Sequence, residues 1–408
     1  MIEFDRYKLR NGLTVILHQD KNTQLAAVNV LYKVGSKDDH PLRTGYAHLF
    51  EHLMFEGTAN AQNFDTVLQN AGGESNAYTN QDLTNYYDIL PAENLETALW
   101  LEADRMFNLQ LTEEKVEIQK RVVVEEFHET CLNVPYGKVW HDILDLSYQN
   151  HGYNWPTIGL VPDHISSAKM EDVVAYHKDY YHPSNAILVV AGGFDMDEAK
   201  KLIEKHFSQF TDTTEVCNLS NGVLLSNERK VIAGREPANA LYFCFHTPNR
   251  ADDKYYASDI LSDVLAADRS SYLYNAVIKD EPLFSDIDAY VTGTIDSGMM
   301  IIEGRVLESQ SVDRAEAKIW ETIDYLQNEL ITEKERIKLQ NKIETNLAFS
   351  EVSILNRAMS LAFFEYNGNV NEINFQVELF EQISREEIRT GFSHWLTKEK
   401  ANVIRYEV

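Results

Sequence analysis

The apolar residues of the N-terminal half change repeatedly between strand-like and helix-like spacing. β-rich runs at residues 13–17 and 26–32 flank the polar stretch 19–22, which predicts a hairpin that feeds a sheet. Residues 44–55 instead repeat at helical spacing. The same reasoning predicts these further elements: a helix at 63–70, a hairpin over 75–90 that turns near 80–82, helices at 94–105 and 112–130, and a buried strand at 186–193.

The C-terminal half repeats this order of elements. A strand-like run at 240–245, a polar turn at 248–253 and a helix at 255–266 parallel the segments 28–32, 35–39 and 45–55. The chain has 408 residues, which is too long for one compact core. We therefore predict an α+β fold of two homologous domains, 1–215 and 216–408, each a mainly antiparallel sheet with helices packed on it. The boundary falls in the polar, turn-forming stretch between Phe210 and Val231.

The charge of the chain narrows the set of partners. A net charge of −27 argues against nucleic acid and anionic membranes, because both would be repelled at long range. The alternative interpretation is that the acidity only keeps a large protein in solution. No apolar run is long enough to span a membrane, and the first residues lack a signal-peptide pattern, so we expect a cytoplasmic protein, or a periplasmic one if a leader has been removed. The three widely spaced cysteines, Cys131, Cys217 and Cys244, fit a reducing compartment.

The segment His48-Leu49-Phe50-Glu51-His52 carries the candidate chemistry. On a helix, His48 and His52 lie one above the other and can offer two imidazole nitrogens to one metal ion. Glu51 projects beside that face, where its carboxylate can accept a proton from metal-bound water as a general base. Zinc held by three protein ligands keeps one position for water and lowers the pKa of that water to roughly 7. The pattern therefore predicts a hydrolytic zinc site.

The alternative is a solvent-exposed helix that carries two histidines and a glutamate by chance. The rest of the helix argues against it, because residues 49–50 and 53–55 are apolar and predict an embedded helix. Buried histidines need a partner, and zinc is a common one.

The segment 48–58 resembles the HxxEH signature of the pitrilysin/insulinase metallopeptidases, the inverted zincins, and is most similar to their short bacterial branch related to the mitochondrial processing peptidase. Further matches occur in the same order along the chain: Asn11-Gly12-Leu13, Gly72-Gly73-Glu74-Ser75-Asn76-Ala77-Tyr78-Thr79, Val122-Val123-Val124-Glu125-Glu126 and Tyr181-His182-Pro183-Ser184-Asn185-Ala186. The resemblance implies a zinc-dependent endopeptidase whose domain 1–215 is catalytic and whose domain 216–408 has no metal site.

The resemblance also implies a third zinc ligand, a glutamate on a second helix. Glu126 lies in the matching segment, and Glu125 and Glu129 are its rivals because the sequence does not show which side of the helix faces the ion. Many relatives carry an acid seven residues before this ligand that supports the site from outside the ligand set. This chain has Gln119 there, so either this neutral amide or Glu117 provides the support.

Substrate binding is implied at residues 76–79. Relatives pair an extended peptide with such a strand edge, and in this sequence Asn76, with Ala77 beside it, would lie nearest the scissile bond. Without the neighbouring motif, Gly72-Gly73 and Asn76 would indicate only a turn followed by a strand.

The segment 273–285 departs from the family. Self-sufficient relatives carry an arginine and a tyrosine here, seven residues apart, which grip the substrate and stabilise the oxyanion. This chain has no arginine in the segment, and Phe284 replaces the tyrosine. Phenylalanine cannot donate a hydrogen bond, and the loss of one oxyanion donor costs roughly 10²–10³ in rate. Possible substitutes with different spacing are Arg269, Tyr272 and Tyr274.

We therefore predict the zinc-bearing catalytic subunit of a two-subunit peptidase, which cleaves peptides or unfolded segments in a chamber. Its partner would be a sister subunit that carries the arginine and tyrosine, and a homodimer is the alternative arrangement. Two other classes are a zinc-bearing but weakly active scaffold subunit of a larger complex and a zinc-storage module. A storage module would need neither Glu51 nor the strand at Asn76.

Overall fold

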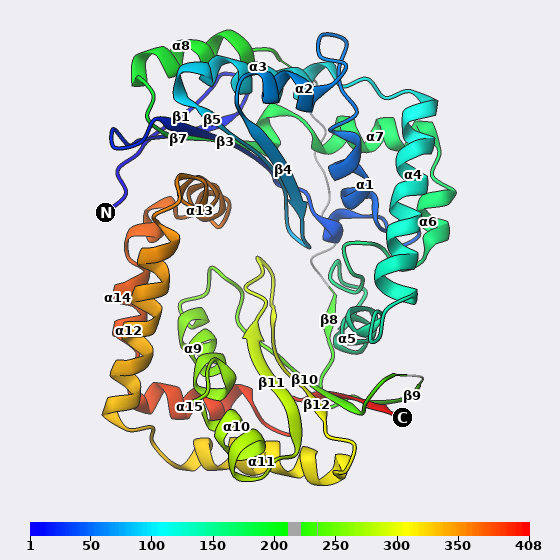
Figure 1. Cartoon of the computed structure of the whole chain (residues 1–408), viewed down its shortest axis with the longest axis vertical. Coiled ribbons are helices and arrows are strands. Elements are labelled where there is room, and N and C mark those ends of the chain that lie inside the picture. The colour runs from blue at the N-terminus through cyan, green and yellow to red at the C-terminus, as the bar shows by residue number, and fades with distance from the viewer. Residues whose placement is uncertain (211–221, 235) are drawn as a thin grey trace. The chain divides into compact units, whose positions relative to one another are not determined.

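The computed structural model describes residues 1–210, 222–234 and 236–408 and divides into two compact units (Figure 1). The described residues of the first unit are 1–130, 155–210 and 348–374, and those of the second are 131–154, 222–234, 236–347 and 375–408. Each unit thus includes a segment from the other half of the chain, unlike the contiguous domains that the sequence predicts. The predicted boundary at 215/216 and Cys217 lie outside the described residues.

The first unit is built on a six-stranded sheet of order β1-β2-β7-β3-β5-β4. Its strands are β1 (Asp5–Lys8), β2 (Thr14–Gln19), β3 (Leu25–Tyr32), β4 (Glu74–Thr79), β5 (Thr84–Pro91) and β7 (Ala186–Gly192). All neighbouring pairs are antiparallel except β2 and β7, which are parallel. The predicted hairpin of β4 and β5 is confirmed, and β4 is an edge strand.

The prediction that residues 13–17 and 26–32 form a hairpin is wrong. Strands β2 and β3 belong to the same sheet, but β7 lies between them and pairs with both. Every residue of β7 is buried, so this apolar strand belongs in the sheet interior with a neighbour on each side. A pairing with a strand more than 150 residues away leaves no local signal in the sequence.

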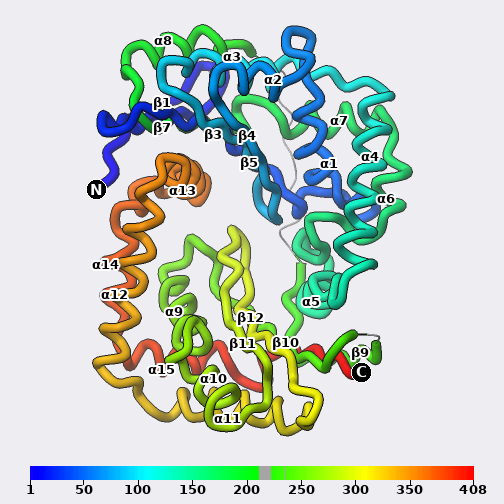
Figure 2. The backbone as a smooth tube through the Cα atoms, in the orientation of Figure 1, coloured from blue at the N-terminus to red at the C-terminus, as the bar shows by residue number. Residues whose placement is uncertain are grey.

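Helices cover both faces of this sheet. They are α1 (Tyr46–Leu53), α2 (Phe64–Asn70), α3 (Leu95–Asn108), α4 (Glu113–Phe127), α6 (Pro162–Ser166), α7 (Met170–Tyr180), α8 (Met196–Phe207) and α13 (Ile354–Tyr366). The main core joins one face of the sheet to residues of α1, α3, α7 and α8. The other face packs on α13, which comes from near the end of the chain (Figure 2). The predicted helices at 44–55, 63–70, 94–105 and 112–130 are confirmed, with shifted ends.

The second unit is built on a five-stranded sheet of order β11-β12-β10-β13-β9. Its strands are β9 (Arg229–Ala233), β10 (Ala240–His246), β11 (Phe284–Val291), β12 (Met299–Val306) and β13 (Asn402–Glu407), and β6 (Tyr148–Gln149) pairs separately with β8 (Val223–Leu224). The helices are α5 (Val139–Ser147), α9 (Tyr255–Ala266), α10 (Tyr272–Tyr274), α11 (Val312–Asn328), most of α12 (Glu333–Ser350), α14 (Gln376–Glu381) and α15 (Arg385–Trp395). One face packs on α9, α11 and α15, and the other on α5.

The two sheets share one topology. Reading β4-β5-β3-β7-β2 against β11-β12-β10-β13-β9, each has three antiparallel pairs followed by one parallel pair. This match confirms the predicted α+β fold of two similar halves. Within the described residues, no single helix is long and apolar enough to span a membrane, and only α12 and α13 together, bent by 109°, pass that test.

Candidate metal centre

Helix α1 presents its two histidines on the side opposite its core contacts. Tyr46, Ala47, Leu49, Phe50 and Leu53 are buried in the main core. The side chains of His48 and His52 remain 12% and 24% exposed. The apolar residues therefore fix the rotation of this short helix about its own axis, and the two imidazoles point away from the core.

Helix α4 brings Glu126 to the histidines. Thr112 caps the helix by accepting a hydrogen bond from the Lys115 amide at 3.3 Å. The buried positions of α4 are Val116, Lys120, Val123 and Phe127, a spacing of four, three and four that defines one inner face. Glu126 lies beside this face and is 38% exposed. The neighbouring Glu125 is 69% exposed and lies 3.8 Å from His128, and Glu129 is exposed.

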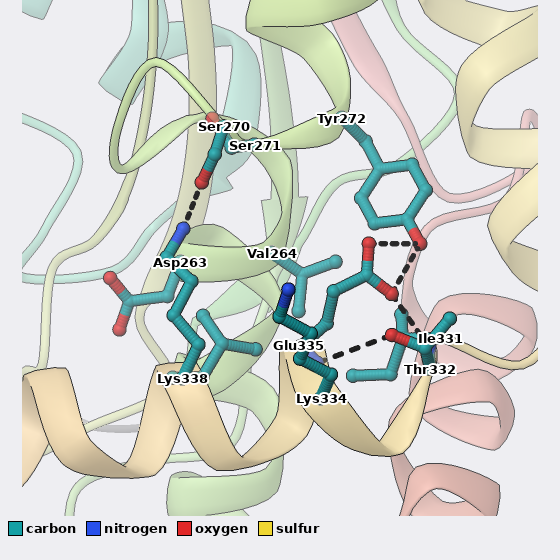
Figure 3. A pocket seen from close by; sticks show the side chains of 11 residues that line it. Asp263, Val264, Ser270, Ser271, Tyr272, Ile331, Thr332, Lys334, Glu335 and Lys338 are labelled. Carbon is teal, nitrogen blue, oxygen red and sulfur yellow. Dashed lines mark hydrogen bonds between the residues drawn. The ribbon is translucent and has the colours of Figure 1, made fainter.

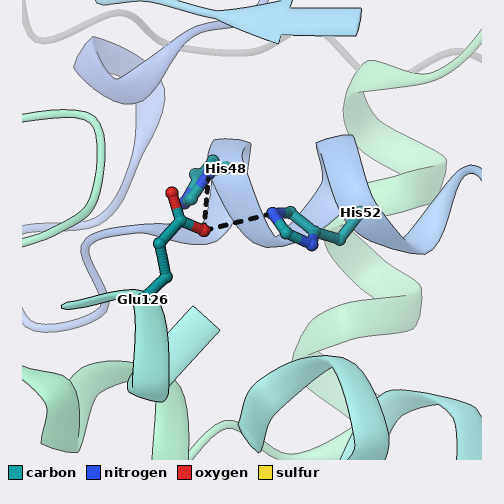
Figure 4. Close-up of side chains that lie close together, drawn as sticks. All are labelled: His48, His52 and Glu126. Atoms are coloured by element: carbon teal, nitrogen blue, oxygen red, sulfur yellow. Dashed lines mark ion pairs between the residues drawn. The ribbon is translucent and has the colours of Figure 1, made fainter. Parts of the chain in front are cut away.

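Three ligand atoms converge at this point (Figure 4). Glu126 Oε2 lies 3.6 Å from His48 Nε2 and 3.5 Å from His52 Nε2, and the three atoms all lie within 4.8 Å of one another. Ligands at roughly 2.0–2.1 Å around a tetrahedral zinc lie about 3.3 Å apart. Among the described residues, this is the one group of three His, Cys, Asp or Glu side chains found close enough to hold a metal ion. The donor set fits zinc, and neither Glu125 nor Glu129 belongs to it.

The protonation preferences of the three groups suit a metal. Burial lowers the pKa of His48, which favours the neutral imidazole that a metal requires. Burial also acts to lower the pKa of His52, but the hydrogen bond and charge of Glu126 outweigh it and raise that pKa. The hydrogen bond from His52 lowers the pKa of Glu126. His52 and Glu126 thus each stabilise the charged form of the other, and a cation bound there would take the place of the His52 proton.

The predicted base and the predicted supporting residue lie next to the histidines. The negative charge of Glu51 acts on both His48 and His52. Gln119 donates a hydrogen bond to Glu56 and lies beside the His52 ring, where it helps to raise the His52 pKa after the larger effects of burial and Glu126. Glu117 pairs instead with Lys120 at 2.5 Å. A neutral amide, and not Glu117, therefore occupies the supporting position.

The predicted substrate strand is available for pairing. β4 is the last strand of its sheet, bonded to β5 on one side only, with Asn76 opposite Tyr87. Asn76 is exposed, and Ala77 packs partly against the core. Helix α1 packs beside β4, so the strand edge and the candidate metal site belong to the same unit.

Of the three possible substitutes for the missing arginine and tyrosine, which all lie in the described part of the chain, only Tyr272 has a bonded hydroxyl, and Tyr274 is partly buried. Phe284 begins β11 and is buried. The Tyr272 hydroxyl donates to the Glu335 carboxylate at 3.1 Å, at the wall of a cavity of about 420 Å³ in the second unit (Figure 3). Lys338, across that cavity, pairs with Asp268 at 2.9 Å. Tyr272 thus bonds to Glu335 and Lys338 to Asp268. Arg269 is exposed.

Sequence reasoning missed two residues that hold α1 in place. Asp39 is buried and accepts hydrogen bonds from the backbone at the start of the helix. The Tyr86 hydroxyl donates to the Phe50 carbonyl at 3.1 Å. Asp39 lies six residues before Gly45, the N-cap residue of α1, and Tyr86 lies on strand β5, far along the chain from the helix. Neither residue is part of a local sequence motif that could have revealed its role.

A helix with two histidines four apart and a glutamate between them, completed by a carboxylate from a second helix, is the donor set of a zinc peptidase. The sequence matches insulinase (peptidase family M16) over residues 14–152 and the peptidase M16 inactive domain over residues 167–343. The chain therefore belongs to the insulinase family of peptidases, M16, which are hydrolases of peptide bonds.

Individual relatives agree with this assignment. The chain is 35% identical over 210 residues to zinc protease PqqE of Helicobacter pylori, a match that covers 51% of this chain and only 47% of that protein. It is 28% identical over 353 residues to the uncharacterized zinc protease YmxG of Bacillus subtilis, covering 85% and 84% of the two chains. A probable mitochondrial-processing peptidase subunit beta of Schizosaccharomyces pombe is 30% identical over 213 residues, covering 52% and 46%.

The fold is also that of a solved protein. The crystal structure of a protease from Helicobacter pylori superposes with a TM-score of 0.93 over 100% of both chains at 23% sequence identity. The similarity at this identity establishes the shared fold.

Proposed function

We propose that the chain is a zinc-dependent endopeptidase in which His48, His52 and Glu126 hold the metal and Glu51 is the general base. The observation that carries this proposal is the convergence of the three ligand atoms within 4.8 Å. The names of two relatives, PqqE and YmxG, as zinc proteases support the choice of metal. Bound zinc would act as a Lewis acid on the substrate carbonyl and make water a better nucleophile near neutral pH.

The residues of the chain perform the proton transfers. Glu51 takes a proton from the attacking water and delivers it to the amine that leaves when the peptide bond breaks. Gln119, held by its hydrogen bond to Glu56, supports the His52 ring from beside it. Burial around His48 keeps its imidazole neutral.

The substrate is proposed to bind as an added strand along β4. Because β4 pairs on one side only, its outer backbone groups can hydrogen bond with an extended peptide. Asn76 is exposed on that strand and would contact the peptide near the scissile bond. This mode of binding favours peptides and unfolded segments over folded proteins.

We further propose that the chain is the zinc-bearing subunit of a two-subunit enzyme. Phe284 offers no hydrogen-bond donor, and the Tyr272 hydroxyl is already bonded to Glu335. The similarity to a protein named as a beta subunit of a processing peptidase supports this arrangement. A sister subunit would then supply the arginine and tyrosine that stabilise the developing oxyanion.

The test is turnover per bound zinc on a mixed peptide library, measured for the isolated chain and with increasing amounts of a sister protein carrying the arginine and tyrosine. The expected result is slow cleavage alone and an increase of roughly 10²–10³ with the partner, the value of an oxyanion donor. Glu51→Gln in this chain should abolish the gain. Vigorous cleavage by the isolated chain that no partner changes would refute the two-subunit arrangement. A zinc-loaded chain that no partner activates would instead favour the scaffold role.

A further inference from the structure

The side chain of Asp39 gathers four hydrogen-bond donors in the interior of the first unit. Its Oδ2 accepts from the backbone amides of Gly45 at 2.7 Å and Tyr46 at 3.1 Å. Its Oδ1 accepts from the Ala47 amide at 3.1 Å and from the Tyr176 hydroxyl at 3.0 Å. Asp39 is only 1% exposed, so these four donors take the place of water around its carboxyl group.

Three of the four donors are the backbone amides of the N-cap residue and of the first two residues of α1. The first amides of any helix have no partner within the helix and need one from outside. Here the N-cap residue is Gly45, which has a φ of 92° and no side chain that could cap the helix. Asp39, six residues upstream, provides the cap instead, because both of its carboxyl oxygens accept from these amides.

The cap matters because α1 is short and carries the candidate ligands. It has eight residues, and helices of this length are marginal without tertiary support. Leu49, Phe50 and Leu53 fix the later part of the helix in the core, and the Phe50 carbonyl accepts the Tyr86 hydroxyl. Tyr46 and Ala47 anchor the first turn in the same core, but its backbone amides still need the cap.

His48 is the third residue of the helix and directly follows Ala47, whose amide Asp39 binds. His52 lies one turn later, in the part that the core holds. Any fraying of the first turn would therefore move His48 away from His52 and Glu126. Tyr176 keeps the cap in place, because its ring stacks on Phe50 at 5.1 Å while its hydroxyl donates to Asp39.

We propose that Asp39 is a positioning residue that, together with Tyr176, holds the first turn of α1 and sets the place of His48 in the metal site. This inference rests on the proposed zinc function. It assigns to Asp39 a role in metal affinity and ligand geometry, not only in folding.

The experiment compares the variants Asp39→Asn and Tyr176→Phe with the control Asp195→Asn. Asp195 caps α8 in the same unit, and its Oδ1 alone accepts from the amides of Asp197 and Glu198, so asparagine at this position removes the acid but keeps the cap. For each protein we would measure zinc affinity by competition with a chelator, the absorption spectrum of the cobalt-substituted form, and the melting temperature without metal.

Asp39→Asn should weaken zinc binding by about 10- to 100-fold, the usual effect of losing a residue that supports a metal ligand. It should also shift the cobalt spectrum, because His48 would change its position. Tyr176→Phe should weaken zinc binding less, and Asp195→Asn should leave zinc affinity, spectrum and melting temperature close to those of the wild type.

The positioning role would be overturned if Asp39→Asn had the zinc affinity and the cobalt spectrum of the wild type. It would also be overturned if Asp195→Asn lost as much zinc affinity as Asp39→Asn. If Asp39→Asn does not fold, Tyr176→Phe decides, and the role is refuted if its zinc affinity equals that of Asp195→Asn. Failure of the wild type to bind zinc would refute the proposed function itself, which keeps the two results distinct.

Discussion

The first helix after the central strand differs between two units of the same topology. In the first unit, α1 places His48 and His52 opposite Glu126 of α4. In the second, α9 carries Asp259 and Asp263 at the same spacing of four, and Asp263 pairs with Lys342 of α12 at 3.2 Å. The two histidines and Glu126 offer three ligand atoms to one metal ion, whereas a lysine already provides the positive charge that pairs with Asp263. The scaffold is duplicated, but the metal chemistry depends on these few side chains.

The carboxyl groups show the same contrast. The hydrogen bond from His52 lowers the pKa of Glu126, so this group is a ready anion. Burial raises the pKa of Asp259 to about 6, and the nearby charge of Asp263 adds to the rise. The negative charge is therefore stabilised at Glu126, beside the two histidines, and is costly at Asp259.

The largest effect is expected from Glu51→Gln. Loss of a general base costs about 10²–10⁴ in rate, and glutamine leaves the histidines and Glu126 unchanged. Turnover should fall by that factor while zinc content, measured on the purified protein, stays equal to wild type. The matched control Glu125→Gln should retain both. Loss of zinc in Glu51→Gln would mean that Glu51 serves as a ligand.

The second-largest effect is expected from Glu126→Gln, which removes the only carboxylate among the three candidate zinc ligands. Zinc affinity, measured by competition with a chelator, should fall by more than the roughly 10–100-fold that a supporting residue costs. Glu125→Gln and Glu129→Gln should bind zinc as the wild type does, because their side chains lie outside the group. A greater loss in Glu129→Gln would show that the helix presents a different residue to the metal.

In the second unit, Asp259→Asn should stabilise the protein at high pH. Because folding raises the pKa of Asp259 from 3.8 to about 6, the folded state binds the proton more tightly, and stability falls as pH rises through this interval. The ionised form costs up to about 3 kcal/mol above pH 6. Urea unfolding should show a gain for Asp259→Asn at pH 8 that disappears at pH 4. The exposed control Asp253→Asn should show no such difference, and an equal gain at both pH values would contradict the raised pKa.

The smallest effect is expected from Lys342→Ala. Lys342 and Asp263 are 28% and 29% exposed, so their pair should contribute only about 0–1 kcal/mol to stability. Turnover and zinc content should not change, since the pair plays no part in the metal site. A second zinc ion bound by Lys342→Ala would show that the lysine charge alone keeps metal out of this unit.

The sequence predicted those features that depend on local spacing. His48, Glu51 and His52 occur within one helical turn and a half, and the helices and the hairpin of β4 and β5 follow from local patterns. The resemblance to the family, and not the spacing, pointed to Glu126. Only the packing of α4, with Val123 and Phe127 buried, shows which of the neighbouring acids faces the histidines.

Features that depend on distant contacts could not be predicted. The insertion of β7 between β2 and β3 needs a pairing with a strand far along the chain. The packing of α13 on the first sheet likewise joins residue 354 and beyond to the N-terminal half. Asp39 caps a helix from six residues away, outside the position where capping motifs are recognised.

The most direct test of the central claim is metal removal and restoration on the wild-type chain, together with its proposed partner. One zinc ion per chain should be present, a chelator should remove zinc and peptide cleavage together, and added zinc should restore both. The double variant His48→Ala and His52→Ala should neither bind zinc nor recover activity. Cleavage that persists without metal, or one zinc ion per chain retained by the double variant, would contradict the assignment of His48, His52 and Glu126 as the zinc site of a peptidase.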